Sequence, residues 1–115
     1  MKMDKHCPVG ETIRLIGGKY KALILWFLTE ETKRYGELQK LIPEATPKML
    51  TQQLRELEAE ALISRTVYPV VPPKVEYALT DLGKSMIPIL ESMYQWGEND
   101  LKERGICPNC AMKKH

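Results

Sequence analysis

The spacing of hydrophobic positions predicts helices in the first half of the chain. Apolar residues recur at helical intervals in three stretches, which are residues 7–16, 19–30 and 33–42. The second stretch is apolar nearly all round, so we expect it to form the central buried helix. Two glycines follow the first stretch and Pro43 follows the third, and both features end helices.

A fourth helix, over residues 47–61, has the clearest pattern. Its apolar positions fall on one face at i, i+4, i+7 and i+11, and they are Leu50, Leu54, Leu57 and Ala61. Thr46 is a natural N-cap and Pro47 a natural first-turn residue. Only residues 43–46 separate this helix from the preceding one, and such a short connection is typical of a helix-turn-helix.

The second half of the chain changes to a strand pattern and then returns to a helical one. Residues 63–68 and 75–79 alternate between the two faces of a strand. Three prolines between them stiffen the connection, which predicts a β-hairpin with a protruding tip that carries Lys74. A long last helix is predicted over residues 80–105, with a kink caused by Pro88.

Length and composition favour one domain. The chain has 115 residues, and 43% of them are hydrophobic, which is enough for one core. The predicted last helix has two apolar faces, so we expect it to pack on a second copy of the chain. No apolar run approaches the roughly 20 residues that cross a bilayer, and the first residues lack an export signal. We therefore expect a cytoplasmic protein with no membrane partner.

The order of elements is that of a winged helix, an α+β fold that is mainly helical. The helix over residues 47–61 can then enter the DNA major groove. Lys48 and Arg55 can reach phosphates or guanine edges, and Gln52 can pair with an adenine edge, as can Gln53. Thr51 can touch a thymine methyl group. The full predicted DNA-binding set is Arg34, Tyr35, Thr46, Lys48, Met49, Thr51, Gln52, Gln53, Arg55 and Lys74.

The polar face of this helix has a second explanation, because one face of an amphipathic helix is ordinarily solvated. The net charge of +2 does not decide between the two, so the argument depends on where charges lie. The capped helix, its short connection and the proline-rich hairpin occur together, and the combination favours DNA. Arg34 and Tyr35, which open the third helix, and Lys74 on the hairpin are placed to contact phosphates.

Long stretches of the chain resemble the HxlR-type family of bacterial winged-helix transcription regulators, which is related to the MarR group. The stretches that carry the resemblance are "CPV" at 7–9, "IGGKYKALILWFL" at 16–28, "RYGELQKLIP" at 34–43, "KMLTQQLRELEAEALISRTVYPVVPPKVEYALTDLGKSMIPIL" at 48–90 and "WG" at 96–97. The resemblance implies a homodimer built from the first and last helices, and a two-fold DNA operator near the regulated genes. It also implies that the helix over residues 47–61 reads the DNA and that the hairpin is the wing.

The resemblance ends before the last residues. We divide the chain into residues 1–104, a winged-helix DNA-binding domain with its N- and C-terminal dimerisation helices, and residues 105–115, a polar tail. The tail departs from the family pattern because it carries two further cysteines.

Cys7 is the candidate redox sensor. It precedes Pro8 at a predicted helix start, where backbone N–H groups and the helix dipole favour the thiolate. Lys5 and His6 add positive charge nearby. Some members of the family that this chain resembles use a cysteine at this position to sense oxidants or electrophiles. The alternative is an ordinary thiol kept for packing.

The "CPNC" pair at residues 107–110 permits two chemistries. It could supply half of a zinc site, with His115, His6 or Cys7 completing it, or it could form a reversible disulfide. A lone pair of this kind is a weak signal, because zinc normally needs four ligands at matched spacing. Cys107, Cys110 and His115 are therefore weak metal candidates, and we predict no cofactor. Across a dimer, Cys7 could also approach Cys107 or Cys110 of the other chain.

The favoured function is a sequence-specific transcription regulator that binds a double-stranded DNA operator as a homodimer. An oxidant or a small molecule is its candidate effector, and aromatic side chains of the core helices could line a pocket for the latter. The sequence shows no catalytic constellation, so we do not expect an enzyme. Two alternatives stay open, a thiol-disulfide or metal-binding protein that uses the "CPNC" tail, and a winged helix used only for protein contact.

Overall fold

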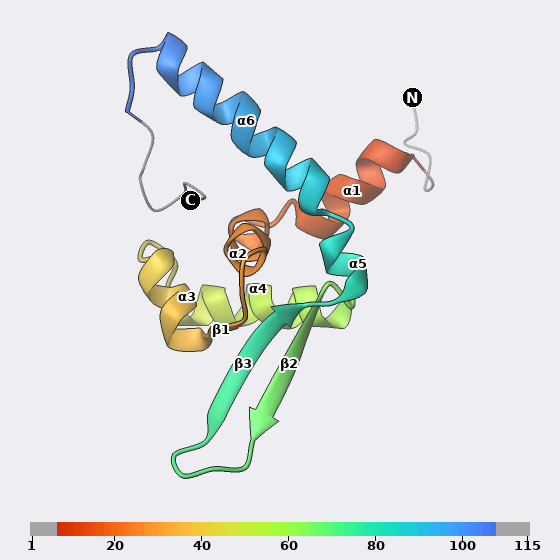
Figure 1. The fold of residues 1–115 in the computed structure, drawn as a ribbon. Helices are drawn as coiled ribbons and strands as arrows, with labels where there is room; N and C mark the ends of the chain where they lie inside the picture. Colours follow the sequence, from red (N-terminus) through yellow and green to blue (C-terminus); the bar gives the residue numbers. More distant parts are fainter. Residues whose placement is uncertain (1–6, 108–115) are drawn as a thin grey trace.

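The computed structural model describes residues 7–107 of the chain (Figure 1). Helices and the strands of one small sheet follow one another along the chain. The elements in chain order are α1 (Pro8–Ile16), α2 (Lys21–Leu28), β1 (Lys33–Arg34), α3 (Tyr35–Leu41), α4 (Pro47–Ala59), β2 (Ile63–Tyr68), β3 (Lys74–Leu79), α5 (Asp81–Lys84) and α6 (Ile87–Glu103). The arrangement is a winged helix-turn-helix, as predicted, in which α3 and α4 form the helix-turn-helix and β2 and β3 form the wing.

Helix α2 lies at the centre of the core, as its apolar sequence predicts. All residues from Ile24 to Leu28 are buried. Helix α4 packs on α2 through its leucine face, where Leu50, Leu54 and Leu57 are almost fully buried. This packing leaves the opposite face of α4 at the surface of the molecule.

The sheet has a third strand that the hydrophobic pattern did not reveal. Its order is β1-β3-β2, and β1 pairs with β3 by placing Lys33 opposite Tyr77 and Arg34 opposite Glu76. The predicted helix over residues 33–42 is therefore wrong at its start. Helix α3 begins at Tyr35, where the Glu37 Oε1 atom accepts a 2.8 Å hydrogen bond from the Arg34 N–H group. Two residues are too few to show strand alternation, so the hydrophobic pattern contains no signal for β1.

Both ends of α4 have a local cause. The Thr46 hydroxyl accepts a 3.1 Å hydrogen bond from the Met49 N–H group, which confirms the predicted N-cap. The helix ends at Ala59, two residues earlier than predicted, because Ala61 takes a left-handed backbone conformation with φ of 62°. The chain then turns directly into β2.

The last predicted helix is two helices. Helix α5 ends at Lys84 and α6 begins at Ile87, with Pro88 in its first turn. Because proline lacks an N–H group, it fits a helix start better than a helix interior. The predicted kink is therefore a break. A close approach also fixes this region, since a Cβ atom on Gly83 would collide with the Leu62 carbonyl oxygen.

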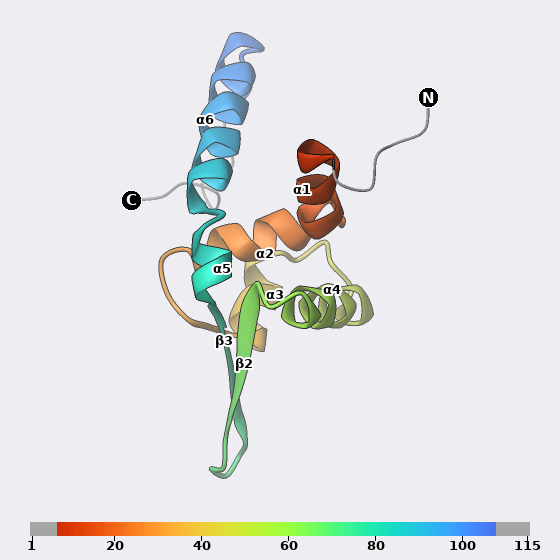
Figure 2. The same ribbon diagram turned by 90° about the vertical axis from the view of Figure 1, so that its right-hand side faces the viewer.

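Helices α1 and α6 leave the body at the end opposite the hairpin (Figures 1 and 2). Several of their large apolar side chains are exposed, and these are Val9, Ile13, Ile89, Met93 and Trp96. The surplus of apolar surface expected for the last helix is thus present, and α1 shares it. No helix among residues 7–107 is long and apolar enough to cross a bilayer.

Candidate nucleic-acid interface

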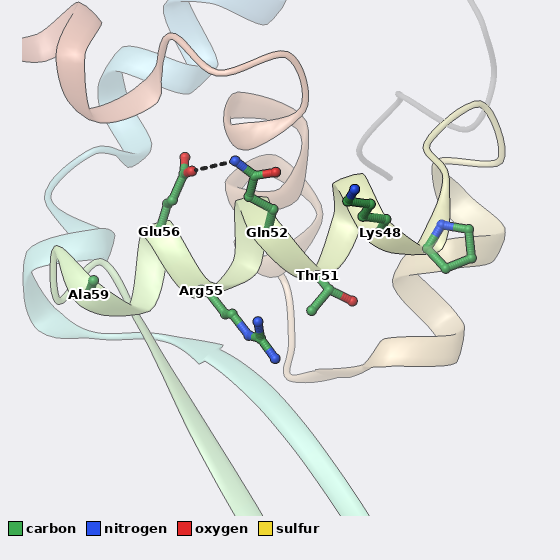
Figure 3. A pocket seen from close by; sticks show the side chains of 7 residues that line it. Lys48, Thr51, Gln52, Arg55, Glu56 and Ala59 are labelled. Carbon is green, nitrogen blue, oxygen red and sulfur yellow. Dashed lines mark hydrogen bonds between the residues drawn. The ribbon is translucent and has the colours of Figure 1, made fainter.

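The outer face of α4 is a shallow groove with a polar lining. Its residues are Pro47, Lys48, Thr51, Gln52, Arg55, Glu56 and Ala59. Figure 3 shows Lys48, Gln52 and Glu56 on one side of the helix, and Thr51 and Arg55 on the side that faces the hairpin. Within the described part of the chain, neither Lys48 nor Arg55 has an ion-pair or hydrogen-bond partner. Two cations on this face are therefore available to an anionic ligand.

Gln52 is held in place by a chain of polar contacts. Its Nε2 group donates a 3.1 Å hydrogen bond to Glu56 Oε2, and the Lys21 Nζ atom of α2 lies 2.8 Å from Glu56 Oε1 (Figure 3 draws the first contact). The hydrogen bond from Lys21, followed by that from Gln52, lowers the pKa of the Glu56 carboxyl. Glu56 is therefore an anion that orients the Gln52 amide. The amide oxygen of Gln52 remains available for a hydrogen bond with a nucleobase.

The structure corrects the prediction for Gln53. This side chain is 6% exposed, and its Oε1 atom accepts a 3.1 Å hydrogen bond from the Tyr20 N–H group. Consecutive residues of a helix point about 100° apart, so Gln53 faces α2 while Gln52 faces outward. Gln53 satisfies a buried donor at the start of α2 and cannot reach a DNA base.

Most of the other predicted residues meet where α3 joins α4. The Tyr35 hydroxyl donates to the Pro47 carbonyl at 3.1 Å and lies 3.5 Å from the Thr51 hydroxyl. Thr46 caps α4, and Met49 is half-buried against the core. These side chains hold the start of α4 in position. Arg34, in contrast, is exposed at the end of β1.

Lys74 is less free than a charge on a loop tip would be. It is the first residue of β3. Its Nζ atom lies 3.3 Å from Glu76 Oε2 and 5.0 Å from the centre of the Tyr68 ring. The tip itself, residues 69–73, contains only proline and valine. Val71 is fully exposed there. The wing therefore ends in an uncharged, rigid loop with its cation at the base of that loop.

A second hollow lies between α4 and the hairpin, and part of its lining was not predicted from the sequence. It encloses about 290 Å³ and is lined by Thr51, Arg55, Glu58, Arg65 and Tyr77. Arg65 belongs to β2, where it is opposite Tyr77 of β3. The sequence showed Arg65 only as one polar position of a strand. Its place beside Arg55 depends on how the hairpin packs against α4.

An ion pair connects α1 to the far end of α4. The Arg14 Nη1 atom lies 2.8 Å from Glu60 Oε2, and the same guanidinium contacts Glu11 of its own helix at 2.9 Å. The hydrogen bond from Arg14 lowers the pKa of the Glu60 carboxyl, and both carboxylates raise the pKa of Arg14. The first helix is thereby joined to the helix that carries the candidate interface.

The two cysteines among residues 7–107, Cys7 and Cys107, belong to the segments that flank α1 and α6. Cys7 is the N-cap of α1 and is half-buried, and its carbonyl accepts a 2.8 Å hydrogen bond from the Glu11 N–H group. Cys107 follows α6 and is exposed. The weak metal candidates Cys110 and His115 lie outside the described residues. Among residues 7–107, no three potential metal ligands come together.

A helix-turn-helix with an exposed polar helix beside a projecting hairpin defines the class of winged-helix DNA-binding proteins. The chain belongs to the HxlR-like helix-turn-helix family, whose family model matches residues 15–105. It is thus a DNA-binding helix-turn-helix transcription regulator. The family predicted from the sequence is confirmed.

Three relatives illustrate the similarity. YdeP, a helix-turn-helix transcriptional regulator of Bacillus subtilis (strain 168), is 50% identical over 92 residues, which are 80% of this chain and 72% of YdeP. The crystal structure of the regulator ytcD matches with a TM-score of 0.79 and 51% identity, over 84% of this chain and 98% of that chain. The redox regulator HypR in its oxidised form matches with a TM-score of 0.78 and 46% identity, over 81% of this chain and 96% of HypR.

Substitution of the two adjacent glutamines of α4 should change the free energy of unfolding by different amounts. Gln53→Ala should lower the free energy of unfolding by about 1–3 kcal/mol, because the buried Tyr20 N–H group loses its acceptor. Gln52→Ala, at an exposed position, should change it by less than about 0.5 kcal/mol. Urea titrations followed by circular dichroism measure both values. Equal unfolding midpoints for the two variants would contradict the structural role given to Gln53.

Proposed function

We propose that the protein regulates transcription by binding a two-fold DNA operator as a homodimer, with α4 in the major groove and the hairpin along the neighbouring backbone. The observation that carries this proposal is the exposed polar face of α4, on which Lys48 and Arg55 have no partner among the described residues. Unpaired cations on an exposed helix face can contact the phosphates of DNA. The wing beside it extends the same surface (Figure 1).

The proposed contacts divide into two kinds. Gln52 pairs with an adenine edge, Thr51 touches a thymine methyl group, and these contacts carry sequence preference. Lys48 and Arg55 contact phosphates or guanine edges. Arg34, Tyr35 and Lys74 contact the backbone and set the position of the protein on DNA without reading sequence. Thr46 and Met49 contribute by fixing the start of α4.

The proposed dimer is formed by α1 and α6. Their exposed apolar side chains border a hollow of about 430 Å³ lined by Val9, Thr12, Ile13, Ile16, Gly17, Ile89 and Met93. A monomer would leave this apolar patch in water, and such patches mark interaction sites. Helix-turn-helix dimers bind half-sites about 34 Å apart, which is one turn of DNA, so the proposed dimer has to present its two α4 helices at that spacing.

Cys7 is the proposed switch of this dimer. Two observations support the proposal: Cys7 begins α1, which is part of the apolar patch, and HypR, a similar protein, is a redox regulator solved in oxidised and reduced forms. Arg14 on the same helix pairs with Glu60 of α4. A displacement of α1 by a disulfide at Cys7 would therefore act on the helix that reads DNA. The partner thiol would be Cys107 or Cys110 of the other chain.

Gln52→Ala should weaken binding to the specific operator by about 1–3 kcal/mol and leave binding to random DNA nearly unchanged, because it removes one base contact. Fluorescence anisotropy on a duplex from upstream of the protein's own gene, or on a duplex selected from random sequences, measures both affinities. Gln95→Ala, an exposed glutamine of α6, is the matched control. Equal losses on both duplexes would remove Gln52 from the base-reading residues, and a wild-type protein that binds no duplex would overturn the proposed function.

Ile13→Glu should convert the dimer to a monomer, because it places a charge in the apolar patch. Light scattering after size-exclusion chromatography gives the mass of each species. Val67→Glu is the control, since Val67 is also an exposed aliphatic side chain but lies on the hairpin. A wild-type protein that is already monomeric at micromolar concentration would contradict the proposed dimer.

Oxidation with diamide should change operator affinity in the wild-type protein and not in Cys7→Ser. Diamide accepts two electrons and two protons from a pair of thiols, which become a disulfide. Non-reducing electrophoresis and anisotropy on the same samples relate the disulfide to the affinity. Cys107→Ser and Cys110→Ser identify the partner thiol. An operator affinity that is the same in reduced and oxidised wild-type protein would exclude Cys7 as a switch.

A further inference from the structure

The hollow between α4 and the hairpin brings together two arginines from separate elements. Arg55 projects from α4 toward the hairpin (Figure 3), and Arg65 comes from β2. Thr51 of α4 and the buried Tyr77 of β3 also line the hollow. Donors from two separate elements therefore border the same space.

The charges in this hollow are not balanced. Two guanidinium groups face one carboxylate, that of Glu58, and Glu58 forms no ion pair with either of them. Neither arginine has any partner within residues 7–107. Two other arginines pair within residues 7–107, Arg14 with Glu60 and Arg104 with Asp100, whereas the exposed Arg34 forms no ion pair there. Two unpaired guanidiniums in one hollow therefore favour an anion that can accept several hydrogen bonds at once.

The size of the hollow favours a small anion. Its volume of about 290 Å³ is below the range of roughly 300–1,000 Å³ that is typical of sites for larger organic ligands. A phosphate group fits this space, and its oxygens match the forked donors of arginine. The position of the hollow also matters, since it opens between α4 and the wing, the two elements that face DNA in the proposed function.

We propose that Arg55 and Arg65 form a clamp for one phosphate of the DNA backbone at the junction of α4 and the wing. This inference rests on the proposed function and adds Arg65 to its DNA-binding residues. The clamp contacts no base, so it supplies affinity and fixes the angle between α4 and the wing on DNA, without sequence preference. A free phosphate ion would offer the same chemistry, and the experiment separates the two sources.

Arg65→Ala should weaken binding to operator and to random DNA by a similar factor, about tenfold, because it removes a charged contact to the backbone. The slope of log affinity against log salt concentration should fall by about one, the value for one lost phosphate contact. The DNA affinity of Arg65→Lys should lie between those of the wild type and Arg65→Ala, since lysine keeps the charge and lacks the forked donors of arginine. Arg104→Ala, which removes the same charge far from the hollow, should leave the slope unchanged.

Arg55→Ala and the double variant complete the test. If both arginines hold the same phosphate, the double variant should lose less affinity than the sum of the two single losses. Thermal unfolding of each variant confirms that the fold is intact, and Arg65→Lys provides the measurement if Arg65→Ala does not fold. Light scattering confirms that every variant keeps the oligomeric state of the wild type.

The outcomes separate the clamp from the proposed function. Wild-type protein that shows no salt-dependent DNA binding overturns both. Wild-type protein that binds DNA while Arg65→Ala keeps its affinity and salt slope overturns the clamp alone, as does a loss confined to the operator. Saturable binding of inorganic phosphate without DNA, measured by calorimetry and lost in Arg65→Ala, combined with an unchanged salt slope on DNA, would assign the hollow to a free anion instead.

Discussion

The packing of α4 on α2 is the contact on which the rest of the structure depends. Leu50, Leu54 and Leu57 bury one face of α4 against the most apolar helix of the chain. Burial of that face decides which residues point outward, because side chains of a helix have fixed angular positions. The contact also places α4 beside the hairpin. The candidate DNA surface is therefore a consequence of core packing.

Polar contacts decide which side chains of α4 remain unpaired at this surface. Gln53 turns inward and accepts a hydrogen bond from the N–H group of Tyr20, the N-cap of α2, and Glu56 is held by Lys21 of the same helix. Glu60 is held by Arg14 of α1. Glu56 and Glu60 are thus tied to helices behind α4, and the unpaired Lys48 and Arg55 remain at the front.

Much of the fold and part of the candidate site could be predicted from local signals. The period of the leucines, the Thr46 cap and the proline-separated strands each depend on residues close in sequence, and all three are confirmed. Gln53 was assigned wrongly although the helical period places it about 60° from Leu50, close to the leucine face, and Gln52 on the opposite side. Strand β1 could not be predicted, because two residues form a strand only where β3 offers them a partner.

The sequence by itself determined the helix-turn-helix, the wing, the family and the surplus of apolar surface on the last helix. These follow from periodicity, capping and residue type, which act over a few residues. Tertiary structure alone decided that Gln53 accepts a hydrogen bond from Tyr20 and that Arg65 lines the same hollow as Arg55. Each of these depends on the distance between elements that are far apart along the chain, and that distance is set by packing of the core.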